Sequence, residues 1–329
     1  MRRAVLSAGL VLALLAMRPV LAAEYAYVPN TGSGTISVID TGSDTVVKTL
    51  PAHGTLGKKL LGLAVSDDGK RLFVVDAPAN GVRVVDAATG KLIQTIPTGK
   101  SPEGVEIAPG GQIAAACAEE SNQVVLFDPQ SLKVIDAIKL QGSNPEHCVF
   151  SPDGKWLLAS NENSNNIDVV NVAERKSVKL VPALNHPRGI GFTPDGKRAY
   201  IANEGANTVQ VLAVGSWKTL KTIPTALRTA GIEVRPDGTH VFVANGGAGT
   251  VQVINTFSDK VVASLKVGGR PWNMAMTQYG TKLYVANGHS NSVSVIDTAD
   301  TPMKVIKTIP VGKLPWGVAI ASQTQASGS

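Results

Sequence analysis

Residues 270–311 read RPWNMAMTQYGTKLYVANGHSNSVSVIDTADTPMKVIKTIPV and carry the clearest structural pattern of the chain. Four runs rich in apolar and β-branched residues are separated by turn residues, and in the third run Val293 and Val295 alternate with Ser292 and Ser294. Short alternating runs of this kind indicate antiparallel strands. The pattern predicts strands at 270–276, 282–286, 292–297 and 304–311.

The same pattern recurs along the chain, and its turns give the register. The turns lie at 66–69, 108–111, 151–154, 193–196, 235–238 and 277–280, so that successive turns start 42, 43, 42, 42 and 42 residues apart. Four strands in a repeat of this length are typical of one propeller blade. The sequence therefore predicts an all-β fold, a seven-bladed β-propeller built of four-stranded antiparallel blades.

The two ends of the repeat array predict how the ring closes. The first copy begins at 25–30, which matches a second strand, so it lacks a first strand. The last copy is followed by a surplus first strand at 314–320. We expect this C-terminal strand to complete the N-terminal blade, because closure hides the sheet edges that an open array exposes.

The first residues do not belong to the repeat. Arg2 and Arg3 precede an apolar stretch and a small-residue end, which is the layout of a signal peptide, although a retained anchor is the alternative. The predicted organisation is a cleaved signal peptide at 1–23, a single propeller at 24–322 and a disordered tail at 323–329. We expect export to the periplasm, with no membrane span after cleavage.

Charge and cysteine content narrow the function. Loss of the leader would leave 28 basic and 25 acidic residues, with no basic stripe of the kind that binds nucleic acid. Cys117 and Cys148 fall in neighbouring repeats. Export would permit a disulfide, whereas the sequence favours two buried free thiols.

The sequence contains no C-x-x-C-H, H-E-x-x-H or G-x-S-x-G motif, and its five histidines are scattered. We therefore predict no catalytic residues, no metal site and no covalently bound cofactor. The aspartates of the Asp-Gly turns and the asparagines that end the second strands are predicted to stabilise turns and loops.

The repeats differ most where each first strand begins. Aligned on the Pro-x-Gly motif, the position before the proline reads Lys59, Ser101, Asn144, His186, Arg228, Arg270 and Leu314, and the position after it reads Leu61, Glu103, Glu146, Arg188, Ala230, Trp272 and Trp316. The first strand of a propeller blade is innermost, so both sets are predicted to surround one mouth of the central channel.

Acidic residues occupy one arc of this predicted mouth, basic residues the next and two tryptophans the third. The arginines can hold a carboxylate or a phosphate by forked hydrogen bonds, and the tryptophans can stack on a planar ligand or anchor a partner. The candidate binding residues are Lys59, Glu103, Asn144, Glu146, His186, Arg188, Arg228, Arg270, Trp272 and Trp316. The alternative is that the charges only neutralise one another and the tryptophans cover the closure seam.

The strand ends at 27–30 and 284–287, Tyr-Val-x-Asn, and the Ser-Val-Ile-Asp runs at 37–40 and 294–297 resemble the YVTN family of β-propeller repeats. With a leader and seven such blades, the chain is similar to exported β-propeller proteins associated with pyrroloquinoline-quinone-dependent alcohol catabolism. That resemblance implies an association with a periplasmic quinoprotein dehydrogenase or a transporter component.

Three functions follow from these observations. The first is a non-catalytic periplasmic accessory protein that binds a small acidic or quinone-like ligand, or a partner protein, at the channel mouth. The second is a lactonase-type propeller hydrolase, for which Glu146, His186 and Arg188 supply suitable residue types. The third is a structural or surface scaffold.

Overall fold

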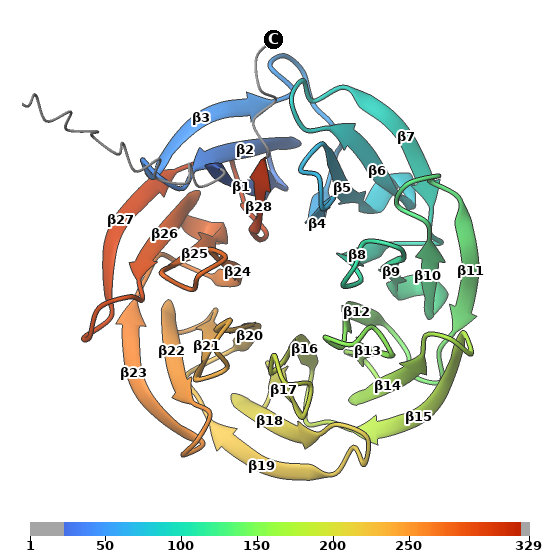
Figure 1. The fold of residues 1–329 in the computed structure, drawn as a ribbon, viewed down its shortest axis with the longest axis vertical. Coiled ribbons are helices and arrows are strands. Elements are labelled where there is room, and N and C mark those ends of the chain that lie inside the picture. The colour runs from blue at the N-terminus through green and yellow to red at the C-terminus, as the bar shows by residue number, and fades with distance from the viewer. Residues whose placement is uncertain (1–22, 324–329) are drawn as a thin grey trace, which may run out of the picture.

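The computed structural model describes residues 23–323, which form a ring of seven four-stranded antiparallel sheets (Figure 1). The predicted fold class is confirmed. The predicted leader, apart from Ala23, and the predicted tail, apart from Gln323, lie outside the described residues.

The blades are numbered from 1 to 7 along the chain, and their strands are given from the channel outward. Blade 1 consists of β28 (Ala319–Gln323), β1 (Ala23–Asn30), β2 (Thr35–Asp40) and β3 (Thr45–Leu50). Blade 2 consists of β4 (Leu60–Val65), β5 (Arg71–Asp76), β6 (Gly81–Asp86) and β7 (Leu92–Pro97). Blade 3 consists of β8 (Pro102–Ile107), β9 (Ala114–Ala118), β10 (Gln123–Phe127) and β11 (Val134–Lys139). Blade 4 consists of β12 (Pro145–Phe150), β13 (Trp156–Asn161), β14 (Asn166–Asn171) and β15 (Lys176–Pro182).

Blade 5 consists of β16 (Pro187–Phe192), β17 (Arg198–Asn203), β18 (Thr208–Ala213) and β19 (Thr219–Pro224). Blade 6 consists of β20 (Thr229–Val234), β21 (His240–Asn245), β22 (Thr250–Asn255) and β23 (Lys260–Lys266). Blade 7 consists of β24 (Pro271–Met276), β25 (Lys282–Asn287), β26 (Ser292–Asp297) and β27 (Lys304–Pro310). Short 3₁₀ turns follow three second strands: η1 (Ala77–Ala79), η2 (Glu119–Ser121) and η3 (Gly288–Ser290). Within 23–323, no helix is long and apolar enough to cross a membrane.

The first strand of every blade is innermost, as Figure 1 shows. Each inner strand contacts the inner strand of the next blade, and β28 contacts both β24 and β4, so the inner strands form a complete ring around the channel. The predicted mouth residues lie at or shortly before the start of these strands, which places them at one end of the channel.

The C-terminal strand closes the ring in the predicted way, but its regular part begins later than expected. Pro315 makes a single bridge to Asn30, and the ladder with β1 resumes only at Ala319, opposite Tyr27. The other inner strands carry a bulge just after their first residue; Pro271 pairs with Asn287, for instance, and the ladder resumes at Met274. The gap after Pro315 therefore corresponds to that bulge.

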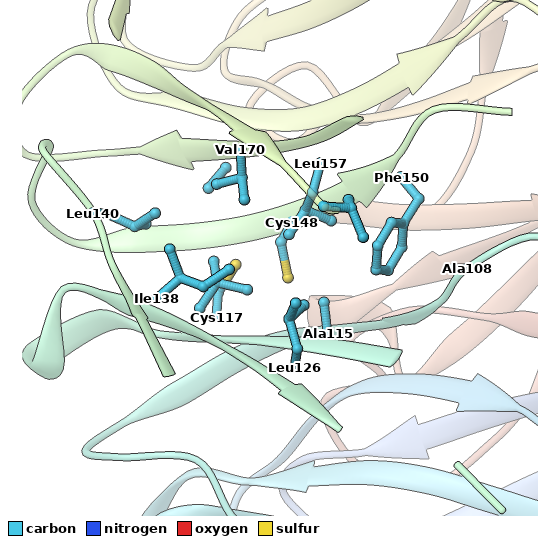
Figure 2. Packing of buried hydrophobic residues seen from close by; sticks show 13 residues of the cluster. Ala108, Ala115, Cys117, Leu126, Ile138, Leu140, Cys148, Phe150, Leu157 and Val170 are labelled. Atoms are coloured by element: carbon cyan, nitrogen blue, oxygen red, sulfur yellow. The ribbon is translucent and has the colours of Figure 1, made fainter. Parts of the chain in front are cut away.

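The apolar core consists of clusters that lie between adjacent blades. Figure 2 shows the cluster between blades 3 and 4, where Leu126 and Ile138 face Phe150, Leu157 and the sulfur of Cys148. The last cluster joins Tyr284 of blade 7 to Val28 of blade 1, so closure buries apolar surface as well as a sheet edge. The outer strands are largely exposed on their outward side.

The constant residues of the repeat stabilise turns and loops, as predicted. In the turn before β17, Asp195 Oδ1 accepts hydrogen bonds from the Thr193 hydroxyl at 2.7 Å and from the Lys197 N–H at 3.0 Å, and Gly196 has a φ of 67°. At the end of β25, the buried Asn287 donates to Ser294 Oγ at 2.9 Å and accepts from the Gly268 N–H at 3.1 Å. These groups bind their own backbone and loops.

Candidate functional site

The rim of the channel mouth is formed by residues in a left-handed backbone conformation. Six of the seven residues that precede the proline position of the repeat have φ values between 51° and 63°: Ser101, Asn144, His186, Arg228, Arg270 and Leu314. An asparagine of the preceding blade stabilises most of these turns; Asn207 Oδ1, for example, accepts the Arg228 N–H at 2.6 Å. Lys59 departs from this pattern, because it lies exposed on the longer loop between β3 and β4.

A second set of rim residues follows the second strand of each blade and was not predicted. Each donates its backbone N–H to the carbonyl of the residue that precedes the inner strand of the same blade; the set is Thr31, Ala77, Glu119, Glu162, Glu204, Gly246 and Gly288. Glutamate therefore stands at this position in blades 3, 4 and 5. That recurrence directly after the strand-ending Asn or Ala was a usable sequence signal.

Glu204 is the centre of the charge network at the mouth. Its Oε2 accepts from Arg188 Nη1 at 2.6 Å, and its Oε1 accepts from Arg228 Nε at 2.7 Å and from Arg270 Nη2 at 3.0 Å. Burial alone would raise the pKa of Glu204, but the surrounding arginines, Arg188 first, lower it to about 2. The three arginines thus hold a carboxylate, as the sequence predicts for a ligand, but this carboxylate belongs to the protein.

Arg188 also joins the acidic arc to this network. It contacts Glu146, which is fully buried, and its Nη2 lies 3.6 Å from Glu103 Oε1. Beside Glu103, the Glu119 carboxyl accepts from the Ser101 hydroxyl at 3.2 Å and from Asn144 Nδ2 at 3.4 Å. Burial and the neighbouring Glu103 raise the pKa of Glu119 to about 8, so this part of the arc holds a proton at neutral pH.

The two predicted tryptophans lie in different surroundings. Trp272 packs over the Arg270 guanidinium, 5.7 Å from the ring centre, and fills the space that a side chain at Gly288 would occupy. Trp316 stacks on His147 with ring centres 5.4 Å apart and an angle of 21° between the planes. Trp316 therefore belongs both to the closure seam and to the wall of the channel.

His147 and Asn273 are functional candidates that the motif alignment missed. They occupy the glycine position of Pro-x-Gly in blades 4 and 7, where Gly104, Gly189 and Gly231 stand in other blades. Glycine is favoured there because an added Cβ would lie 2.3–2.8 Å from the backbone of the next inner strand. The two exceptions place polar side chains in the channel, and the loss of the motif glycine was the signal that identifies them.

Two cavities meet at these residues. One, of about 10 Å³, lies on the mouth side between Arg188, Trp272 and Trp316, which leaves room for no more than a water molecule. The other, of about 170 Å³, continues into the channel toward Glu106. His147, Asn273 and Trp316 line both cavities and so form the constriction between them. A quinone-like ring would have to lie outside the smaller cavity.

The electrostatics of His147 suit proton transfer. Burial lowers its pKa, against the opposing effect of Glu103, so the imidazole is neutral at neutral pH. Its Nε2 lies 4.0 Å from Glu146 Oε1, close enough for the carboxylate to stabilise an imidazolium that forms transiently.

Two further carboxyls lie deeper in the channel. Glu106 on β8 and Glu233 on β20 occupy the same register position, and each accepts a backbone N–H of the next inner strand: Phe150 to Glu106 at 2.6 Å, and Met276 to Glu233 at 3.2 Å. Burial raises the pKa of both to about 8. They are therefore neutral at neutral pH.

The structure thus brings together Glu103, Glu146, Arg188, Arg228, Arg270, Trp272 and Trp316, with Asn144 beside them. His186 pairs at the exposed rim with Glu162, at 3.0 Å, and Lys59 stands apart. The mutual neutralisation considered from the sequence is present, since each arginine has a carboxylate partner. Across 23–323, no group of three or more His, Cys, Asp and Glu residues is arranged to hold a metal ion.

Comparison with known proteins identifies a family. The family model described as "Lactonase, 7-bladed beta-propeller" matches residues 127–185 and 174–313. A protein of Bacillus subtilis (strain 168), named Uncharacterized protein YwhL, is 28% identical over 149 residues, which make up 45% of this chain and 31% of that protein. The chain therefore matches about a third of the length of this relative.

Solved structures share the fold at low identity. Hydrazine synthase of Kuenenia stuttgartiensis superposes with a TM-score of 0.75 at 22% identity, over 83% of this chain and 92% of that one. Two proteins described as candidate 6-phosphogluconolactonases do likewise. For the one from Bacteroides uniformis ATCC 8492 the TM-score is 0.76 at 20% identity, over 91% and 100% of the two chains. For the one from Bacteroides fragilis NCTC 9343 it is 0.75 at 20%, over 92% and 98%.

Proposed function

The chain belongs to the family of seven-bladed β-propeller lactonases, and from this membership we propose that it hydrolyses a lactone in its central channel. The observation that carries the proposal is the placement of His147. A neutral imidazole is stacked on Trp316 at the constriction between two cavities, with a buried carboxylate beside it. A neutral imidazole in this position can accept a proton from a water molecule.

Hydrolysis of a lactone requires three things from the site. A base takes a proton from the attacking water, a donor stabilises the oxyanion that forms at the ring carbonyl, and the departing ring oxygen receives a proton. His147 would take the proton from water and return it to the ring oxygen as the C–O bond breaks. Asn273, which lines the same two cavities, would donate its amide N–H to the oxyanion. The product is the open hydroxy acid.

The space available favours a small substrate. The channel cavity of about 170 Å³ is smaller than most pockets for drug-sized ligands, which are roughly 300–1,000 Å³. Arg228 at the rim is half exposed and lines neither cavity, so it can attract the anionic ring substituent of an approaching substrate to the mouth. The two relatives described as candidate 6-phosphogluconolactonases support a substituent of this charge.

A lactone panel tests the proposal, with release of the hydroxy acid followed by base titration at constant pH, with and without divalent metal. We expect turnover by the wild type and a loss of about 10²–10⁴-fold in His147→Gln. His53→Gln, an exposed histidine on the loop between β3 and β4, is the matched control and should keep full activity. Absence of turnover across the panel would contradict the function, and full activity in His147→Gln would contradict the assigned base.

The accessory role is the second candidate. It is favoured by the small cavity between the tryptophans and by the internal pairing of the arginines, which make the mouth a closed surface better suited to a partner than to a small ligand. The resemblance adds export to the periplasm and association with a pyrroloquinoline-quinone-dependent dehydrogenase. Co-purification of such a dehydrogenase with the wild type, but not with Arg228→Ala/Arg270→Ala, would support this role. If the double variant retained as much dehydrogenase as the wild type, the channel mouth would not be the binding surface for this partner.

A further inference from the structure

Two thiols from neighbouring blades meet in the core beside the channel. Cys117 lies on β9 of blade 3 and Cys148 on β12 of blade 4, and their exposed fractions are 0% and 4%. Figure 2 shows both sulfur atoms inside the cluster between the two blades. Both side chains belong to one cluster of buried residues, and the strands that carry them contact each other although they belong to different sheets.

The strands that carry the two thiols are joined by packing alone. β9 and β12 contact each other across the interface, but each is hydrogen-bonded only to strands of its own sheet. A disulfide requires Cβ atoms about 3.5–4.5 Å apart and sulfur atoms about 2 Å apart. Because no ladder of hydrogen bonds joins β9 to β12, the two side chains can reach this separation by a shift of one strand against the other.

We propose that Cys117 and Cys148 are a redox site, a dithiol that oxidises reversibly to a disulfide joining blades 3 and 4. The oxidant is a low-molecular-weight disulfide such as oxidised glutathione, which is too large for the cavity of about 170 Å³ beside Cys148 and therefore reaches the thiols when the interface between blades 3 and 4 opens or while the chain folds. One Cys sulfur attacks it to give a mixed disulfide and release one thiol; the second Cys then displaces the other thiol. Two S–H bonds are lost and one S–S bond forms, while the oxidant takes up both electrons and both protons.

Cys148 is the residue that meets the oxidant first. It borders the cavity of about 170 Å³ in the channel, whereas Cys117 is fully enclosed. Burial raises the pKa of the Cys117 thiol well above its usual range, with a further contribution from Cys148, and this disfavours the thiolate needed for the first attack. Cys117 therefore acts as the resolving thiol once Cys148 carries the mixed disulfide.

The bridge would constrain the strand that carries the candidate site. Cys148 directly follows Glu146 and His147 on β12, so a covalent link to β9 would hold these residues against blade 3. The bridge would also close a loop of 30 intervening residues, which restricts the unfolded chain. Neither effect depends on the proposed hydrolysis.

The test uses the full chain, incubated in its native state and also refolded, in each case with oxidised glutathione or with dithiothreitol. Free thiols are then alkylated under denaturing conditions and counted by intact mass. We expect two labels on the reduced protein and none on the oxidised one, and a Tm that is higher by roughly 5 °C or more after oxidation. Dithiothreitol should reverse both changes.

Cys117→Ala and Cys148→Ala provide the controls. The quantity compared is the oxidised-minus-reduced shift in Tm within each variant, so the packing lost by the substitution cancels. Both variants should show no shift, and Cys117→Ala should retain a glutathione adduct on Cys148. Two labels on the wild type after both oxidising treatments, a bridge between two molecules, or a shift that persists in the single variants would each overturn the proposal.

Discussion

The two ends of the propeller use the same repeat in opposite ways. At the turn end, six blades repeat a positive-φ glycine and four of them also repeat an aspartate that binds its own turn, so the side chains are largely repeated along with the backbone. At the mouth, the left-handed backbone before the inner strands is almost as constant, but it carries side chains as different as Asn144, His186, Arg228 and Leu314. A fixed backbone therefore leaves the mouth residues free to differ.

The ends also differ in the reach of their interactions. Turn aspartates bond within a few residues, whereas Glu204 of blade 5 pairs with Arg228 and Arg270, which lead into blades 6 and 7. Variation at the mouth thus builds contacts between blades. The comparison predicts that changes at the mouth and at the seam cost more stability than changes at the turns.

The largest effect is expected from removing the closing strand. Deletion of residues 314–329 takes β28 from β1 and exposes the apolar surface around Val28 that Val318 and Ile320 cover. Burial of these side chains and of Trp316 is worth roughly 5 kcal/mol, and a sheet edge is exposed in addition. We expect loss of the single cooperative thermal transition, measured by calorimetry.

A shorter truncation serves as the control. Removing residues 324–329 deletes no residue of β28, so the transition should stay where it is. If the deletion of 314–329 left the calorimetric transition unchanged, closure by the C-terminal strand would not stabilise the ring.

The second effect is expected at the centre of the mouth. Glu204→Gln keeps the shape of the side chain but leaves Arg188, Arg228 and Arg270 without their shared carboxylate. Loss of a buried charge partner costs about 3–5 kcal/mol. Glu162→Gln is the matched control, because Glu162 occupies the same position in blade 4 and, among the described residues, its one ion pair is with the exposed His186; this substitution should cost under about 1 kcal/mol.

The pH dependence of stability should distinguish the same two variants. The pKa of Glu204 is lowered to about 2 in the fold from an ordinary value of 4.5, so its contribution is complete above pH 4.5 and is lost as the pH falls through 2. The free energy of unfolding of the wild type, measured in urea, should therefore fall between pH 6 and pH 3. In Glu204→Gln the part of this fall that comes from protonation of Glu204 should be absent. Equal curves for the two proteins would mean that the arginines do not hold this carboxylate ionised.

The sequence was sufficient to predict the ring because one pattern is repeated at nearly fixed spacing, and because the missing first strand at one end matches the surplus strand at the other. It also placed Glu103, Arg188 and Trp316 at one mouth, since their register in the repeat is defined. The pairing could not be predicted in the same way. Glu204 binds Arg270 across 66 positions, and that distance in sequence becomes contact only through the curvature of the ring.

The third effect is expected inside the channel. The pKa values of Glu106 and Glu233 are raised to about 8, so the folded state binds more protons than the unfolded state between pH 4.5 and 8. As far as these groups contribute, the free energy of unfolding is therefore highest below pH 4.5, and it falls as the pH rises to 8.

Glu106→Gln/Glu233→Gln should remove this alkaline loss, because the amide oxygen still accepts the N–H of Phe150 or Met276 without a proton to lose. The measurement is the urea midpoint at pH 6 and pH 9, with the exposed Glu120→Gln as control. A double variant that lost stability at pH 9 as steeply as the wild type would show that these carboxyls are not the groups that titrate.

The smallest effect is expected at the turns, where it tests whether the constant positions are equivalent. Gly154 and Gly196 have φ values of 68° and 67°, and a Cβ added at either would have nothing within 4 Å. Substitution by Ala should therefore cost only the left-handed backbone energy, about 1 kcal/mol in each case, and Asn should cost less because it tolerates this conformation. If Gly154→Ala and Gly196→Ala lower the free energy of unfolding in urea by equal amounts and leave lactone turnover unchanged, the turn end contributes to the fold and not to function. Unequal losses of stability would mean that the turns of blades 4 and 5 are not equivalent. The turn end would then vary between blades as the mouth does, only to a smaller extent.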